Sequence, residues 1–93
     1  SQDIKGNVLY KNNAKEQTKV VFSRIKDILN DAKMDFENIV KIQIFIKNIK
    51  DIEDVSIVRD EIFKDIRPAS LMLEVSNFVK RGCVVEIDAI AVK

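Results

Sequence analysis

The 93-residue sequence contains no histidine. This absence excludes catalytic triads with a histidine base, zinc sites built on imidazole, and histidine pH switches. The only cysteine, Cys83, cannot form a disulfide within the chain or a thiolate metal cluster. We therefore expect no metal and no other cofactor. A lone free thiol also suits a reducing compartment, so we expect a protein of the cytoplasm or of an organelle.

The chain also lacks an excess of charge of one sign and a long apolar run. Sixteen Lys and Arg residues against fifteen Asp and Glu residues leave a net charge of +1, which gives no basic surface for nucleic acid or an anionic membrane. No apolar run approaches the ~20 residues of a membrane-spanning helix. With 46% apolar and 33% charged residues, the composition is that of a globular protein, and we expect one domain over residues 1–93.

Only two glycines and one proline interrupt the chain, so periodicity has to set the boundaries of its elements. Residues 8–10 are a short apolar run and predict a brief strand. Asn13, three residues before Glu16, is close to a capping box and predicts a helix that ends near Ala32. The apolar stripe expected on this helix consists of Val21, Ile25, Ile28, Leu29 and Ala32.

The period then changes twice. Residues 40–47 alternate between apolar and mostly polar side chains, which predicts a strand with one apolar face and with Phe45 on the other. Residues 51–63 return to helical spacing. Alternation resumes over residues 70–76 and 83–92, which predicts two further strands.

The expected order is therefore β-α-β-α-β-β, an α/β (α+β) fold with a mixed sheet. Each β-α-β unit should give parallel neighbours, and the last two strands should form an antiparallel hairpin. Two helices can cover only one face of such a sheet. Because the last strand is largely apolar on both faces, and Phe45 and Met72 add apolar bulk to the second face, we expect another subunit to cover it. The sequence thus predicts a homo-oligomer.

Two carboxylates on the last strand form the first candidate site. Glu86 and Asp88 are two residues apart, so their side chains point the same way, roughly 7 Å from each other. Between Val84 and Ile90, at least one carboxylate could be partly desolvated and suited to activating water. The alternative is that both face solvent or form salt bridges. Arg67 could hold a substrate carboxylate by a bidentate contact, or could be an ordinary surface arginine.

Five segments of the sequence resemble segments of the RidA (YjgF/YER057c) family, and they occur in the same order and at similar spacing along the chain. The segments are RPASLMLEV at 67–75, VEIDAIA at 85–91, DFENIVK at 35–41, Gln17-Thr18 and Ile28-Leu29. The resemblance implies a chorismate-mutase-like fold, a homotrimer, and ligand pockets at the subunit interfaces. It also implies hydrolytic deamination of reactive enamines and imines such as 2-aminoacrylate, with no cofactor.

The resemblance also assigns roles to residues. In the family's scheme a glutamate positions the attacking water, and that position is Glu86 here. The family's arginine, which holds the substrate carboxylate, directly follows Pro-Ala, and that position is Ser70. A serine hydroxyl is neutral, whereas an arginine guanidinium makes two charge-assisted hydrogen bonds to a carboxylate. The replacement should weaken carboxylate binding by on the order of a few kcal/mol. Other pocket positions also differ: Met72 stands for a cysteine, Ser56 for an asparagine and Arg59 for a tyrosine.

We therefore expect a RidA-like protein with an altered or inactive site, and three functions follow. One is an imine or enamine deaminase that uses Glu86, with Arg67 or Arg59 as a replacement carboxylate clamp. Another is a non-catalytic trimer that binds a small metabolite or a regulatory partner. The third, an endoribonuclease or translation-inhibitor role carried as a label by some family members, has the least physical support, because the chain has no histidine and a charge of only +1.

The resemblance finally implies an N-terminal segment with two strands ahead of Gly6 that this chain does not contain. The chain also does not begin with methionine. We expect that the protein has lost these strands or that the sequence belongs to a longer gene product.

Overall fold

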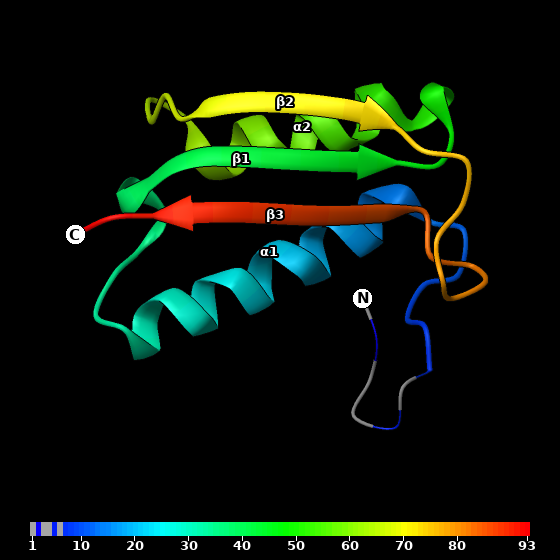
Figure 1. Ribbon diagram of the computed structural model, residues 1–93, viewed down its shortest axis with the longest axis horizontal. Helices are drawn as coiled ribbons and strands as arrows, with labels where there is room; N and C mark the ends of the chain where they lie inside the picture. The colour runs from blue at the N-terminus through cyan, green and yellow to red at the C-terminus, as the bar shows by residue number, and fades with distance from the viewer. Residues whose placement is uncertain (1, 3–4, 6) are drawn as a thin grey trace.

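A computed structural model describes residues 2, 5 and 7–93. Figure 1 shows one sheet with both helices behind it. In chain order the elements are α1 (Ala14–Asp31), β1 (Ile39–Ile46), α2 (Ile52–Phe63), β2 (Ala69–Glu74) and β3 (Val85–Ala91). Short 3-10 turns at Phe36–Asn38 and Ile49–Asp51 precede β1 and α2. The α+β class is therefore confirmed.

Helix α1 begins where its capping residue predicts. Asn13 has an extended backbone, and its Oδ1 accepts a hydrogen bond from the Glu16 N–H at 3.1 Å. The predicted apolar stripe is only partly right, because Leu29 is buried but Ile28 is 68% exposed. The residues that α1 buries are Ala14, Gln17, Thr18, Phe22 and Leu29. α1 lies along the β3 edge of the sheet (Figure 1). Ile28 lines an open cavity there together with Val85 and Ile87 of β3.

The sheet has the order β2-β1-β3, so the predicted hairpin is wrong. β1 pairs in parallel with β2, as the β-α-β unit predicts, and in antiparallel fashion with β3. The connection over residues 75–84 passes the end of β1, which separates the last two strands. Two backbone hydrogen bonds hold it there: the Val75 N–H donates to Ile46 O at 2.9 Å, and the Lys47 N–H donates to Val84 O at 3.0 Å.

Residues 8–10 do not form the predicted strand. Val8 makes only an isolated bridge with Gln2. Tyr10 and Asn12 then adopt positive φ angles of 52° and 60°, which turn the chain and stop an extended run. The segment is therefore a tight lead into α1.

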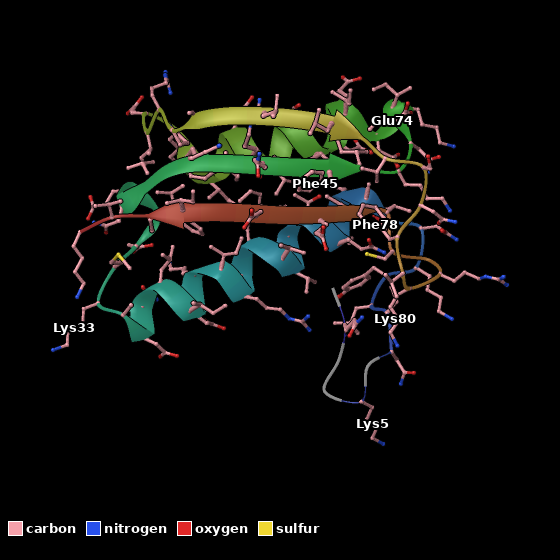
Figure 2. The ribbon with its side chains drawn as sticks, viewed as in Figure 1. Lys5, Lys33, Phe45, Glu74, Phe78 and Lys80 are labelled. Carbon is pink, nitrogen blue, oxygen red and sulfur yellow. The ribbon has the colours of Figure 1, made fainter. Side chains whose placement is uncertain are left out.

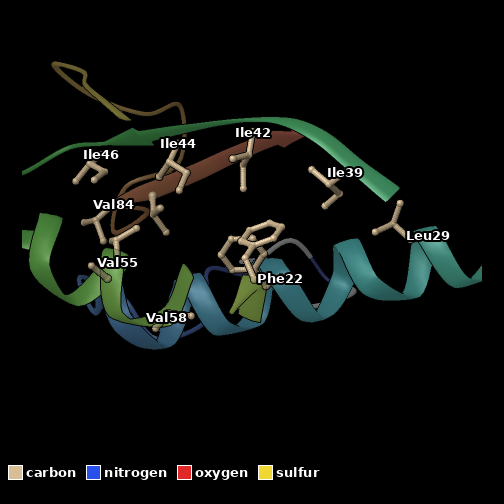
Figure 3. Packing of buried hydrophobic residues seen from close by; sticks show 12 residues of the cluster. Phe22, Leu29, Ile39, Ile42, Ile44, Ile46, Val55, Val58 and Val84 are labelled. Carbon is tan, nitrogen blue, oxygen red and sulfur yellow. The ribbon is translucent and has the colours of Figure 1, made fainter. Parts of the chain in front are cut away.

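The apolar core lies between the sheet and the helices (Figure 3). Ile42, Ile44 and Ile46 alternate along β1 and are at most 1% exposed, so the predicted period-two face is confirmed. Beneath them, Phe22 packs edge-to-face against Phe63, with ring centroids 5.8 Å apart. This core fixes which face of each strand points away from the helices.

The other face of the sheet, called the open face below, has no helix over it in the described part of the chain (Figure 1). The register places its side chains in three rows across β2, β1 and β3: Ala69, Lys41 and Ile90; Leu71, Gln43 and Asp88; Leu73, Phe45 and Glu86. Leu71, Leu73 and Ile90 are 46%, 43% and 53% exposed. The open face is thus apolar along β2, while β3 carries two carboxylates and the apolar Ile90. Exposed apolar surface of this kind is typical of a face that packs against another molecule.

Neither α1 nor α2 is long and apolar enough to cross a membrane, and the same holds throughout the residues that the structure describes.

Candidate functional site

The first half of the candidate site is a cavity of about 400 Å³ at the C-terminal end of α2, called the arginine pocket below. Its walls come from α2, from the loop that follows it and from the start of β2: Arg59, Asp60, Phe63, Lys64, Ile66, Arg67, Pro68 and Ser70. Three cationic side chains and one carboxylate, that of Asp60, therefore line one cavity, which leaves an excess of positive charge. An anionic group such as a carboxylate is the ligand that this charge favours.

The turn after α2 positions Arg67. Lys64 ends the helix with a φ of 49°, which reverses the chain toward β2. Arg67 Nη1 donates to Lys64 O at 2.6 Å, so the guanidinium satisfies a carbonyl that the helix end leaves free. One edge of this guanidinium is used in that contact, and its remaining N–H groups stay available to a ligand.

Arg59 reaches the position at which the resemblance places the family's arginine. Its Nη1 lies 3.5 Å from Ser70 Oγ, at the long end of a hydrogen bond, and its Nε lies 3.1 Å from Asp60 Oδ1. The Arg59 side chain is 26% exposed, less than the 71% of its Asp60 partner. The structure thus brings together three predicted residues, Arg59, Arg67 and Ser70, and places a guanidinium beside the serine.

Two other predicted residues lie outside this cavity. Ser56 Oγ is 3.9 Å from Met72 Sδ, and both side chains are half-buried where α2 packs on β2. Neither lines the arginine pocket. In the single chain, Ser56 and Met72 form part of the contact between α2 and β2 and not part of the pocket wall.

The second half of the candidate site is a cavity of about 470 Å³ beside the start of β3, called the glutamate pocket below. Apolar side chains and Glu86 share its wall with a few polar groups: Gln2, Phe45, Val75, Asn77, Phe78, Val79, Lys80, Cys83 and Glu86. Figure 2 shows Phe45, Phe78 and Lys80 gathered at this end of the sheet. Glu86 and Asp88 are both exposed, so the expected desolvation of one carboxylate is not found in the single chain.

The two pockets lie at opposite ends of the sheet and on opposite faces. β2 and β3 both pair with β1 but run in opposite directions, so their first residues are at opposite ends (Figure 1). Ser70 pairs with Ile42, which faces the core, whereas Glu86 pairs with Phe45 on the open face. One chain therefore cannot bring Glu86 to Arg59 and Arg67.

Sequence reasoning missed part of the glutamate pocket. Phe78 and Lys80 come from the polar connection before β3, which the pattern treats as a turn between strands. The one sequence signal was an aromatic residue, Phe78, in an otherwise polar turn. In the structure Phe78 is half-buried. Among the described residues, no group of three or more Cys, Asp or Glu side chains is arranged to hold a metal ion.

Comparison with known proteins places this architecture in a class. The solved structure of a Rid-family protein from Yersinia pestis superimposes with a TM-score of 0.86 and 36% identity, over 94% of this chain and 68% of that one. A family model described as Endoribonuclease L-PSP matches residues 1–93. The chain therefore belongs to the Endoribonuclease L-PSP family, which includes the RutC, RidA and YjgF proteins.

Two curated proteins are similar to this chain over most of its length. A RutC family protein of Pyrococcus abyssi is 35% identical over 85 residues, which cover 91% of this chain and 66% of that protein. The 2-iminobutanoate/2-iminopropanoate deaminase of Bos taurus is 36% identical over 78 residues, which cover 84% of this chain and 56% of that protein. This chain thus spans less than two thirds of the length of each of these two relatives.

Proposed function

We propose that the protein binds small imines or enamines that carry a carboxylate and hydrolyses them at an altered RidA-type site. The observation that carries this proposal is the position of Arg59 beside Ser70, with Arg67 in the same cavity. The guanidinium lost at position 70 is replaced from α2 and from the loop that follows it. The name of the Bos taurus relative supplies the substrate class.

The site is completed by a second copy of the chain. Glu86 lies on the open face, whereas the arginine pocket lies on the helix side of the sheet. A ring in which each chain packs one end of its sheet against the next chain would bring the Glu86 of one chain to the arginine pocket of its neighbour. Leu71, Leu73 and Ile90 supply exposed apolar surface for such a contact. The RidA resemblance makes a homotrimer the expected ring.

The proposed chemistry needs no group beyond the side chains present. Arg59 and Arg67 hold the ligand carboxylate, and an enamine takes a proton on carbon to become the imine. Glu86 of the neighbouring chain accepts a proton from water while the water oxygen attacks the imine carbon. The carbinolamine nitrogen then takes the proton held by Glu86, the C–N bond breaks and ammonia leaves. The hydroxyl proton passes to solvent, replacing the one taken up at carbon, and a 2-oxo acid remains. A positioned base of this kind contributes roughly 10²- to 10⁴-fold in rate.

Glu86 is tested by its amide. A serine dehydratase generates 2-aminoacrylate, and pyruvate release is followed with and without this protein. We expect the wild type to accelerate release and Glu86→Gln to lose about 10²- to 10⁴-fold of that acceleration. Asp88→Asn is the matched control, because Asp88 lies on the same strand and face but does not line the glutamate pocket, and it should retain most activity. An equal loss in both variants would contradict the assignment.

Arg59 is tested by binding of a stable product. We expect Arg59→Met to weaken the binding of 2-oxobutanoate, measured by calorimetry, by about 10- to 100-fold, the usual loss for a charge-assisted hydrogen bond. Arg67→Met should weaken it less, because one edge of that guanidinium already bonds Lys64 O. The carboxamide analogue should bind weakly to the wild type and to both variants alike. Unchanged affinity for the acid in Arg59→Met would reject the clamp.

The same experiments decide between the remaining functions. A wild type that binds 2-oxobutanoate but does not accelerate pyruvate release would be a non-catalytic binding member of the family. An RNA-cleaving role has weaker support, because the sequence has no histidine and a net charge of +1.

A further inference from the structure

A buried amide joins two distant segments of the chain. Gln17, in the first turn of α1, has no exposed surface. Its Nε2 donates to Gly82 O at 2.7 Å and to Tyr10 O at 3.0 Å, and its Oε1 accepts from the Val84 N–H at 2.9 Å. Gln17 and Gly82 are 65 residues apart in sequence. Every hydrogen of the amide is therefore used to tie the turn before α1 to the loop before β3.

The backbone around this amide shows that the two segments meet closely. The Asn12 N–H donates to Gly82 O at 2.8 Å. Gly82 has a φ of +87°, a conformation that favours glycine, and a Cβ added there would lie only 3.0 Å from Lys11 Cγ. The Lys47 N–H donates to Val84 O at 3.0 Å, which links the same point to the end of β1.

The loop that Gln17 holds is one wall of the glutamate pocket. Phe78, Lys80 and Cys83 line that pocket with Glu86, and Val84 lies two residues before Glu86 in the chain. Within the loop the hydrogen bonds are local, such as the Cys83 N–H to Lys80 O at 3.2 Å. The loop tip is solvent-exposed, with Val79 fully so. The position of the wall therefore depends strongly on the buried anchor at its end.

We propose that Gln17 is the positioning residue of this site: by fixing Gly82 and Val84 it sets the pocket wall and the place of the Glu86 carboxylate. The inference rests on the proposed role of Glu86. Gln17 itself is buried and touches no ligand, so it acts only through the loop. Its loss would leave the Val84 N–H buried without its acceptor, and the loop would shift to find one.

A matched pair of variants separates positioning from general destabilisation. Gln17→Met keeps a similar volume and removes all three hydrogen bonds. Thr18→Val is the control, because Thr18 is equally buried and its Oγ1 donates to Ala14 O, one turn back in the same helix, at 2.6 Å. Both variants lose a buried polar group in α1, but only the first loses a bond to the loop. Unfolding in urea gives the stability of each, and conditions are chosen where both are folded.

Cys83 supplies a readout that does not need activity, because it is the only thiol in the sequence and lies in the loop wall. We expect Ellman's reagent to label Cys83 at least tenfold faster in Gln17→Met than in the wild type, and less than twofold faster in Thr18→Val. In the pyruvate assay, kcat of Gln17→Met should fall at least tenfold with KM nearly unchanged, since the arginine pocket has no Gln17 contact.

Equal labelling rates in the two variants, or activity that falls only in proportion to unfolded protein, would overturn the positioning role. Faster labelling of Gln17→Met in a protein whose wild type is inactive would support the loop anchor and reject the deaminase function alone. The two proposals therefore fail in different ways.

Discussion

Replacing Leu73 with glutamate should convert the proposed assembly into folded monomers. Leu73 is 43% exposed on the open face and shares a row of the sheet with Phe45 and Glu86. In a single chain the new carboxylate would reach water, so the fold should survive. In the proposed assembly it would be buried in an apolar contact near the Glu86 carboxylate, and the lost hydration and like-charge repulsion together cost several kcal/mol, enough to abolish most association. Light scattering after gel filtration measures the mass.

The control for this variant is Ile57→Glu. Ile57 is 40% exposed on α2, in the helix layer and not on the open face, so the same chemical change at similar exposure should leave the mass unchanged. The acceleration of pyruvate release should disappear with Leu73→Glu and persist with Ile57→Glu, because the proposed site needs two chains. A wild type that is monomeric at micromolar concentration, or a Leu73→Glu protein that still assembles, would contradict the arrangement.

Phe22→Ala should remove a large part of the stability of the fold. Phe22 is 1% exposed and makes edge-to-face contacts with Phe36 and Phe63, with ring centroids 6.2 Å and 5.8 Å away. Truncation leaves a cavity between α1, α2 and the sheet, and such a change lowers the free energy of unfolding by about 3–5 kcal/mol. Since domains are stable by only about 5–15 kcal/mol, the urea midpoint should fall sharply, with an unchanged slope.

Phe78→Ala is the aromatic control for that measurement. Phe78 is half-buried in the glutamate pocket and lies outside the core cluster. It should lose much less stability than Phe22→Ala. Equal losses at the two positions would show that the loop before β3 contributes as much to the stability as the aromatic cluster does, and would contradict this prediction.

Local chemistry made most of the elements predictable. Asn13 caps α1 because a side-chain oxygen at that point satisfies a free N–H, and this depends only on neighbours in sequence. The isoleucines of β1 alternate because one face of the strand meets the helices. Val55 and Val58 fall on the buried side of α2 for the same reason with a helical period.

Features set by tertiary packing could not be predicted in this way. Alternation predicts strands at residues 70–76 and 83–92. The same alternation fits a hairpin and two strands separated by β1 equally well, and the structure has the second arrangement. Likewise, the helical period of α1 includes Ile28, and only the position of the helix at the edge of the sheet leaves that side chain exposed.

The candidate site shows the same limit. The resemblance named Glu86 and the residues around Ser70, and the structure gathers Arg59, Arg67 and Ser70 into one cavity. The predicted hairpin already runs the last two strands in opposite directions, but only the structure shows that Glu86 lines a separate cavity from Ser70. Gln17 was invisible as an anchor, since a polar residue in a helix counts as exposed until its burial is known.

The opposite directions of β2 and β3 have a consequence for how activity depends on the amount of protein. Under the proposed arrangement a lone chain carries two half-sites and no whole one, so working sites appear only as chains associate. Near the dissociation constant their number rises more steeply than the chain concentration, and halving synthesis removes more than half of the activity. Under that arrangement, the direction of two strands makes the activity depend on gene dosage.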